Sequence, residues 1–442
     1  MKRKWIGALI ATTISLSIFS PASYAEEEPG ISPQEILLGT TYPQTRPVAD
    51  YYTSYFVGAN AYLSYLNDQG GIYGRKIKLI SFDDQNIPVR AVQGVSQLIL
   101  KDKVFALFSS TPSVAGHIAM STAVNPGRRG IPDLFPVVSW SGFRDSKKYP
   151  TTFVLSPSAQ QEARAISSFI KDEFPNLSFY ATVQDDDLGR EAQTAWRDIG
   201  FSVKQYRSFV AGGPNYAFID DENGGILFSS YITNRGKSSN PLIARSDAVS
   251  SINRLPNISK GDWTNTFTGL YLPLPNESGD EFVDFFNKLF SKYAPGQEVD
   301  VNTIEGANAA YVLGQSLAAI GPQPTRRKLI EFLRTKGNTL SHAGYEPLNF
   351  GVARDSNKTT FYFAKFDGFI WTKHSDYYST ELNSNIVSKS NSIRSRLLPN
   401  GLPLISSDSF SKKIVITCTK GKITKQVSSL NPRCPAGYKV KK

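Results

Sequence analysis

The chain has 442 residues, of which 40% are apolar and 20% are charged, and its formal net charge is +11. This length allows roughly two to three domains with a sizeable buried core. The composition excludes a disordered chain, a collagen-like chain and a small scaffold that depends on disulfides.

The positive charge lies at the two ends of the chain. Lys2, Arg3 and Lys4 begin it, and residues 412–442 contain nine Lys or Arg and no acidic residue, so residues 5–411 are almost neutral. A body that binds nucleic acid needs a clustered basic face. We therefore expect no nucleic-acid partner.

The first 25 residues have the pattern of an export signal peptide. The basic start precedes the apolar residues 5–19, and the small residues Ser23 and Ala25 stand at −3 and −1 of a cleavage site. The apolar stretch is shorter than the about 20 residues of a bilayer-spanning helix. With no Cys near the cleavage site, we expect a protein exported to the periplasm, cell wall or cell surface without a lipid anchor.

Short apolar runs alternate with amphipathic segments from Glu35 to Ala244. Residues 35–39 predict a buried strand, and apolar residues spaced three and four apart from Tyr52 to Leu66 predict a helix that ends before Gly70. The pattern restarts after Pro157, which predicts two α/β lobes with parallel sheets. The other predicted strands are 76–82, 104–108, 136–139, 178–183, 225–230 and 241–244, and the other predicted helices are 160–174 and 190–199.

The last third of the chain predicts three helices, a strand pair and a tail. The helices are expected at 278–293, 304–320 and 325–335, and the strands at 359–367 and 369–373. From Ser379 the composition changes to Ser and Asn, which predicts a solvated linker over 379–411 before the basic tail at 412–442.

Residues 39–84 resemble the start of the branched-chain amino-acid-binding (leucine-binding) family of periplasmic binding proteins. That family has a strand, a turn containing prolines, a helix ending in Asn-x-x-Gly-Gly-Ile-x-Gly-Arg, a second strand and an Asp pair. Residues 153–166 and 305–320 extend the resemblance to about Lys373. The matching residues are Pro43, Thr45, Pro47, Asn67, Gly70, Gly71, Ile72, Gly74, Arg75, Asp83 and Asp84.

The resemblance implies the type I periplasmic binding fold, which has two Rossmann-like lobes and a hinge of three crossings. Lobe 1 would comprise residues 33–153 with 275–348, and lobe 2 residues 157–272 with 350–376. The crossings would lie near 154–156, 272–274 and 348–350. The implied function is that of a solute-binding protein, which captures an amino acid or similar amide or carboxylate by hinge closure and delivers it to an ABC permease and ATPase.

The ligand-binding residues are expected in loops that follow strands, because ligands of open α/β sheets bind beyond the carboxyl ends of the strands. A ligand carboxylate needs N–H and hydroxyl donors, and a buried ammonium needs a carboxylate. The predicted loops supply both kinds of group. The resemblance places ligand contacts at Tyr51, Ser109 or Thr111, Ser141, Tyr231 and either Ser246 or Asp247, with Asp247 preferred as the ammonium partner and Trp140 beside Ser141.

Several of these residues have an alternative role without a ligand. Tyr51 begins an aromatic helix face and can be a core residue, Trp140 and Tyr231 can pack within a lobe, and Asp247 can cap a helix. The chain also departs from the family, with Leu188 in place of a tyrosine. A turn glycine is replaced by Arg46, and Trp140 replaces a small residue or proline. These departures argue against a leucine-like ligand, and Arg46 offers a charge for a second ligand carboxylate.

Catalysis and metal binding find no support in the sequence. Gly314–Ala318 imitates a nucleophile elbow, but Ser316 lies inside a predicted helix, whereas an elbow needs a strand before the serine. His117, His342 and His374 have no metal-ligand spacing. We therefore predict a binding protein with no cofactor, with a ligand-sensing subunit and a secreted hydrolase as the alternatives.

The tail contains both cysteines, Cys418 and Cys434. Export favours a disulfide between them over two free thiols. The basic loop that this bond would close is suited to anionic polymers or lipid head groups. Retention at the cell surface is our hypothesis for the tail, and a solvated tail without a partner is the alternative.

Overall fold

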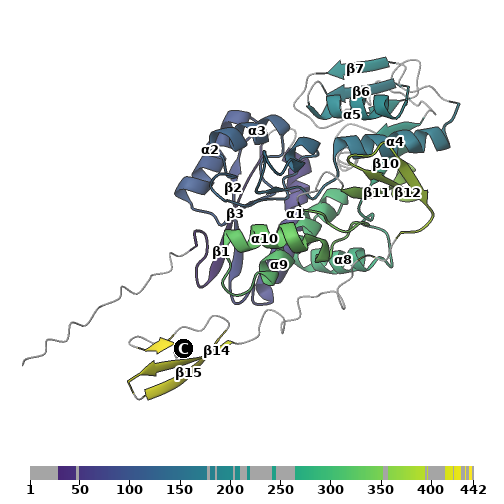
Figure 1. Ribbon diagram of the computed structural model, residues 1–442. Coiled ribbons are helices and arrows are strands. Elements are labelled where there is room, and N and C mark those ends of the chain that lie inside the picture. Colours follow the sequence, from purple (N-terminus) through teal and green to yellow (C-terminus); the bar gives the residue numbers. More distant parts are fainter. Residues whose placement is uncertain are drawn as a thin grey trace, which may run out of the picture.

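The chain folds into two α/β lobes followed by a small β-sheet (Figure 1). The expected α/β class and the three-crossing arrangement are confirmed in this computed structural model. The residues that the structure describes are 28–45, 49–176, 180–184, 187–202, 205–209, 217–219, 241–244, 264–351, 357–393, 396, 414–421, 423–429, 434 and 438–440.

The first lobe is built on a parallel sheet in the order β2-β1-β3-β4-β5. Alternate residues of its strands face opposite sides. Ile36, Leu38 and Phe108 face a large core with α1 and α9, whereas Leu37 and Leu107 face a second cluster with α2 and α3. The strands are β1 (Glu35–Tyr42), β2 (Lys76–Asp83), β3 (Ala106–Phe108), β4 (Asp133–Leu134) and β5 (Thr152–Phe153).

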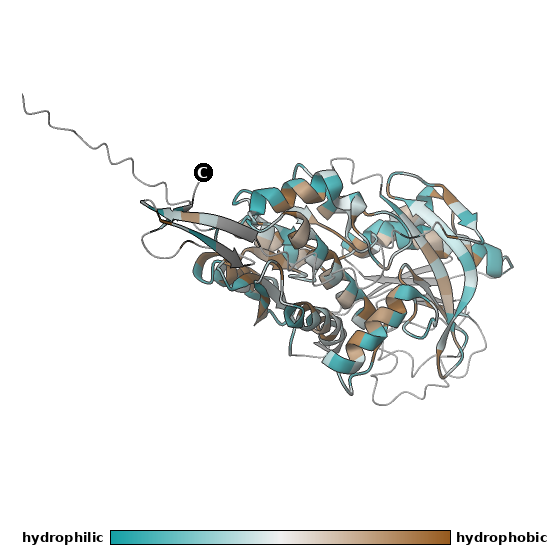
Figure 2. Cartoon of the chain, turned by 90° about the horizontal axis from the view of Figure 1, so that it is seen from below, coloured by the Kyte–Doolittle hydropathy of each residue, from teal (hydrophilic) through white to brown (hydrophobic). Residues whose placement is uncertain are grey.

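Helices cover both faces of this sheet (Figure 1). Peripheral helices carry both hydrophobic and hydrophilic residues, as expected of helices that bury one face (Figure 2). The helices of the first lobe are α1 (Ala49–Asp68), α2 (Pro88–Ser96), which continues as a π-helical turn (Gln97–Lys101), α3 (Val114–Ala123), α8 (Glu281–Tyr293), α9 (Val301–Ala319) and α10 (Arg326–Lys336).

Helices α1 and α9 approach each other closely at two glycines. A Cβ atom on Gly306 would lie 1.8 Å from the carbonyl oxygen of Tyr55, and one on Gly58 would lie 1.9 Å from that of Thr303. Both distances are far below van der Waals contact, so glycine is needed at these two positions for the observed packing.

The second lobe has a mixed sheet in the order β13-β12-β11-β10-β9-β8-β6-β7. The pairs β6–β7 and β9–β10 are parallel, and the other neighbours are antiparallel. Our expectation of a parallel sheet was wrong here. The short turns between β11, β12 and β13 permit only antiparallel pairing, and β8 and the β10–β11 pair add further antiparallel neighbours. The strands are β6 (Tyr180–Gln184), β7 (Gln205–Phe209), β8 (Ala217–Ile219), β9 (Leu242–Ala244), β10 (Thr266–Leu270), β11 (Lys358–Phe366), β12 (Trp371–Glu381) and β13 (Val387–Ser390).

Two helices, α4 (Ala159–Glu173) and α5 (Asp187–Asp198), pack against each other in this lobe, and α4 lies on the sheet. Their core contains Phe169, stacked on Phe363 at a centroid distance of 4.0 Å, and the fully buried Trp196. The Nε1–H group of Trp196 donates to the carbonyl oxygen of Ala163 at 3.0 Å, which ties α5 to α4.

Two predicted boundaries were wrong. Residues 136–139 form no strand, because β4 ends at Leu134, and the carbonyl oxygen of Ser139 accepts a hydrogen bond from Ala159 N–H. The linker expected from Ser379 is strand up to Glu381 and again in β13, since Tyr377 and Tyr378 anchor this hairpin in the core. The strand predicted at 225–230 lies outside the described residues.

The chain passes between the two sheets in three places. It leaves the first lobe between β5 and α4, returns between β10 and α8, and leaves it again between η5 (Gly337–Thr339) and β11. Residue 155 in the first passage, residue 271 in the second and residue 348 in the third line one hollow. The crossings that the resemblance implied therefore come together in space.

The tail forms a separate sheet in the order β15-β14-β16, with β14 (Ile414–Lys420), β15 (Ile423–Ser429) and β16 (Lys439–Val440). A disulfide joins Cys418, on β14, to Cys434. Lys420, Lys425 and Lys439 are exposed.

Candidate functional site

The loop after β3 holds Ser109 and Thr111, and both side chains are fully buried. Ser109 Oγ lies 2.8 Å from Tyr55 Oη, and Thr111 Oγ1 lies 2.8 Å from Thr41 Oγ1. The Thr111 backbone N–H also donates to the carbonyl oxygen of Thr41 at 2.7 Å. Both residues have positive φ angles, 50° and 52°. Their hydroxyls therefore hold a tight loop at the carboxyl end of the sheet and face the lobe interior.

A buried His–Asp pair contacts the backbone of this loop. His117 Nε2 lies 2.8 Å from Asp133 Oδ2, and His117 Nδ1 lies 3.3 Å from the carbonyl oxygen of Thr111. The Thr152 hydroxyl donates to the same Asp133 oxygen at 2.9 Å. Sequence analysis missed this pair, because the two residues belong to different elements, α3 and β4.

A second buried acid, Asp84, follows β2 at the same edge. Its Oδ1 accepts the Asn86 backbone N–H at 2.8 Å, and the side chain is 1% exposed. Burial raises the pKa of Asp84 to about 6, against the lowering effect of hydrogen bonds from Asn86 and Thr41, while the nearby Asp83 raises it further.

The turn after β4 presents Trp140 and Ser141, both partly exposed. Ser141 begins the 3₁₀-helix η2 (Ser141–Arg144), and the indole of Trp140 folds back over Gly142, where a Cβ atom would lie 2.5 Å from the ring. Trp140 also meets the Phe143 ring edge-on at 4.9 Å. The absence of a side chain at Gly142 thus leaves the space that the indole of Trp140 occupies.

Helix α5 of the second lobe reaches this turn. Leu188 packs on an apolar cluster that contains Trp140 and Phe143. Glu191 Oε2 accepts the Ser141 backbone N–H at 3.1 Å, and Glu191 Oε1 accepts the Gln160 backbone N–H at 3.4 Å. The two lobes therefore meet directly where α5 contacts Ser141.

Burial raises the pKa of Glu191, and three influences oppose it. These are the hydrogen bonds from Ser141, the charge of Arg144 and the hydrogen bond from Gln160. Sequence analysis noted Leu188 but missed Glu191, although Glu191 lies one helical turn later on the same face of α5.

A hollow of about 460 Å³, which includes space open to solvent, lies where the three passages meet. It is lined from the first lobe by Arg144, Asn308 and His342, and from the second by residues 357–360. Burial lowers the pKa of His342 to about 4, so its ring is neutral at pH 7, and His342 Nε2 lies 2.7 Å from the carbonyl oxygen of Glu346. Sequence analysis missed this hollow, because the residues that line it come from distant segments of the chain.

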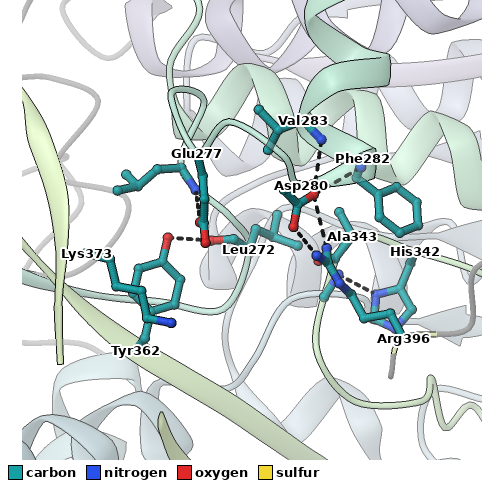
Figure 3. Close-up of polar contacts among 12 residues, drawn as sticks. Leu272, Glu277, Asp280, Phe282, Val283, His342, Ala343, Tyr362, Lys373 and Arg396 are labelled. Atoms are coloured by element: carbon teal, nitrogen blue, oxygen red, sulfur yellow. Dashed lines mark hydrogen bonds and ion pairs between the residues drawn. The ribbon is translucent and has the colours of Figure 1, made fainter. Parts of the chain in front are cut away.

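A polar cluster on the first lobe holds Arg396, which follows β13 of the second lobe in the chain (Figure 3). The Arg396 guanidinium forms an ion pair with Asp280 and donates to the carbonyl oxygen of Ala343 at 3.1 Å. Asp280 Oδ1 also accepts the backbone N–H groups of Phe282 and Val283, which caps α8 (Figure 3). Arg396 thereby fastens the chain that leaves the second lobe to the start of α8.

Part of the predicted ligand set lies outside the described structure. The backbone of Tyr51 lies in α1, but its side chain is not described, and Tyr231 and Asp247 are outside the described residues. Ser316 lies in the last turn of α9, buried, with its hydroxyl donating to the carbonyl oxygen of Val312 at 2.7 Å. Its helical position lacks the strand-to-helix turn of a nucleophile elbow.

Comparisons with known proteins agree with the resemblance. Residues 35–217 match the family model described as "Periplasmic binding protein". An "Amino acid binding protein" of Pseudomonas aeruginosa is 32% identical over 90 residues, which are 20% of this chain and 22% of that protein. The chain thus matches less than a quarter of the length of that curated relative.

Solved structures show the same fold. A possible leucine/isoleucine/valine-binding protein of Rhodopirellula baltica aligns with 77% of this chain and 96% of its own, at 14% identity and a TM-score of 0.65. The branched-chain amino acid transporter substrate-binding protein LivJ of Streptococcus pneumoniae, solved with isoleucine, aligns with 79% of this chain and all of its own, at 14% identity and a TM-score of 0.60. The fold that the resemblance implied is therefore confirmed.

Proposed function

From this kinship with periplasmic binding proteins, we propose that the chain is the exported solute-binding component of an ABC-type uptake system. It captures a small polar ligand, an amino acid or similar amide or carboxylate, between its lobes. The observation that supports this best is the hollow at the three passages, which residues of both lobes line and to which Arg144, at the end of the short helix that Ser141 begins, contributes. A ligand held there is enclosed by hinge movement of one lobe over the other.

The proposed contacts are the residues at which the resemblance places the ligand. Trp140 supplies an aromatic wall and Ser141 a hydroxyl, while Ser109 and Thr111 shape the adjoining loop. Tyr51, Tyr231 and Asp247 complete the set, with Asp247 pairing a ligand ammonium. The lobes of this proposal are 33–153 with 275–348 and 157–272 with 350–376, and the three passages support that division.

The chain acts as a binding protein without catalysis. The family match and the solved relatives concern solute-binding proteins, and Ser316 is held inside a helix. Its partners are a permease and an ATPase, which receive the ligand. A Ser316→Ala protein with unchanged ligand affinity agrees with this view, whereas a hydrolytic activity lost in that variant contradicts it.

Export depends on residues 1–25, which are removed at Ala25. Along the described residues, no helix combines the length and the apolarity needed to cross a bilayer. The basic tail at 412–442 holds the protein at an anionic polymer of the cell surface. Deletion of these residues should release the protein into the medium without altering ligand binding, and unchanged retention contradicts the role of the tail.

The decisive experiment is ligand identification on the mature protein, residues 26–442. Native mass spectrometry reports a ligand carried through purification, and calorimetry with amino acids, amides and short carboxylates measures affinity. We expect binding on the order of micromolar and a smaller radius of gyration by X-ray scattering when the ligand is present. A broad library that produces neither binding nor contraction would overturn the proposal.

The ammonium partner is tested separately. If the ligand carries an amine, Asp247→Asn should weaken its binding about tenfold or more, because the buried ammonium loses its counter-charge. Ser246→Ala tests the other candidate for this role, and its ligand affinity should stay close to that of the parent if Asp247 is the ammonium partner. Equal affinity of the parent and Asp247→Asn proteins would move the ammonium site elsewhere.

A further inference from the structure

The contact between Glu191 and Ser141 joins the two lobes at the candidate ligand site. Glu191 lies in α5, one turn after its start, and each of its carboxylate oxygens accepts one backbone N–H. One N–H belongs to Ser141 of the first lobe, and the other belongs to Gln160 in the first turn of α4.

Both N–H groups belong to the first turn of a helix, where no intrahelical acceptor exists. Their neighbours are already satisfied, because Ala159 N–H donates to Ser139 and Gln161 N–H donates to the Ser158 hydroxyl. Glu191 supplies the acceptor for the two remaining groups. A carboxylate is a strong acceptor for such N–H groups.

The surroundings favour a fixed position for this carboxylate. Leu188, three residues earlier in α5, packs its apolar side chain on the buried cluster against which Trp140 also packs. Arg144, in the same short helix as Ser141, contributes a positive charge that favours the ionised form of Glu191. The carboxyl group of Glu191 thus lies between the two lobes, beside the turn at Ser141.

We propose that Glu191 is a specificity-determining residue of this site, which makes the inference dependent on the function proposed above. Its carboxylate accepts the Ser141 N–H that a ligand carboxylate would otherwise use. Its charge also repels an anionic ligand group placed next to Ser141. The ligand therefore presents an uncharged or cationic group to this corner, and any ligand carboxylate points elsewhere.

The test removes the internal carboxylate and asks whether a free one replaces it. Glu191→Ala leaves the Ser141 and Gln160 N–H groups without their acceptor, and Glu191→Gln keeps an acceptor without the charge. Glu173→Ala is the matched control, since Glu173 also lies in the second lobe but pairs with His374. Each protein is titrated with sodium formate, and with formamide and sodium chloride as controls, while the midpoint of thermal unfolding is recorded.

We expect formate to raise the midpoint of the Glu191→Ala protein by about 3 °C with saturation, as for a ligand that binds the native state. Formamide and chloride should have much smaller effects, and the parent, Glu191→Gln and Glu173→Ala proteins should not respond specifically to formate. Equal responses of parent and Glu191→Ala, no formate response, or an equal effect of chloride would each overturn the inference. Glu191→Ser is used in the same way if Glu191→Ala does not fold.

The result is independent of the identity of the natural ligand. A formate response together with a failed ligand library would sustain the carboxylate position while overturning the proposed function. A ligand found in the library without a formate response would leave the function standing and remove the role of Glu191.

Discussion

Replacing Gly306 by alanine tests the packing of the first lobe. Gly306 faces the backbone of α1, and the new Cβ atom would lie 1.8 Å from the carbonyl oxygen of Tyr55. A carbon–oxygen contact needs about 3.3 Å, so α1 and α9 must separate locally by about 1.5 Å. The atoms to be moved are helix backbone, which cannot rotate away as a side chain can.

Two effects of opposite sign decide the outcome. Alanine favours a helix over glycine by about 1 kcal/mol. Overpacking a close-packed core costs about 3 kcal/mol at the upper end of the usual range, which applies because the clash is with backbone and the neighbouring Tyr55 and Tyr62 are buried. The net loss should be about 2 kcal/mol, or a fall of about 5 °C in the unfolding midpoint.

Calorimetry of the mature protein measures this change, with Gly314→Ala in the same helix as the control. At Gly314 the new Cβ atom would meet the Tyr62 side chain at 3.3 Å and Leu66 at 3.4 Å, contacts that small shifts relieve. That variant should unfold within about 2 °C of the parent. A Gly306→Ala protein as stable as the parent would refute the close helix approach.

Three further predictions concern charge and covalent structure. Because the pKa of Asp84 is raised to about 6, the folded protein retains this proton between about pH 4 and pH 6 while the unfolded chain has lost it, so the contribution of Asp84 to stability falls as the pH rises. In urea titrations the free energy of unfolding of Asp84→Asn should exceed that of the parent by about 2 kcal/mol at pH 7.5 and match it near pH 3.5, and parallel pH profiles would contradict this. Arg396→Ala leaves the Asp280 carboxylate without its cation and should lower the free energy of unfolding by about 3 kcal/mol, with Arg396→Lys intermediate. Equal losses in both variants would contradict a contribution from the positive charge at this position. Reduction of the disulfide between Cys418 and Cys434 should destabilise the tail sheet by about 3 kcal/mol and leave the melting of the lobes unchanged, and a shift of the main calorimetric transition would show that tail and lobes are coupled.

Much of the fold follows from apolar spacing in the sequence. The helix face from Tyr52 to Leu66 and the buried run of β1 have the periods of the elements that they form, and α1 and β1 lie where those periods predict them. The hairpin of β12 and β13 was mistaken for linker because its Ser-rich composition resembles a loop. Its strand character comes from pairing with β11, and composition does not report pairing.

The candidate site was harder to predict than the fold. The turn at Ser141 was found because it follows a strand region, but its bond to Glu191 spans 50 residues. The ion pair of Arg396 with Asp280 spans 116 residues. Such contacts depend on how two lobes are placed against each other, and the local periodicity of a segment contains no information about that placement.

The attachment of Arg396 to the start of α8 has a mechanical consequence. If the tail is tethered, tension on it enters the protein at the Asp280 ion pair on the first lobe and bypasses the outer strand β13 of the second. The first lobe is then held in place by the tail, and the second lobe is free to move about the hinge without tension from the tail.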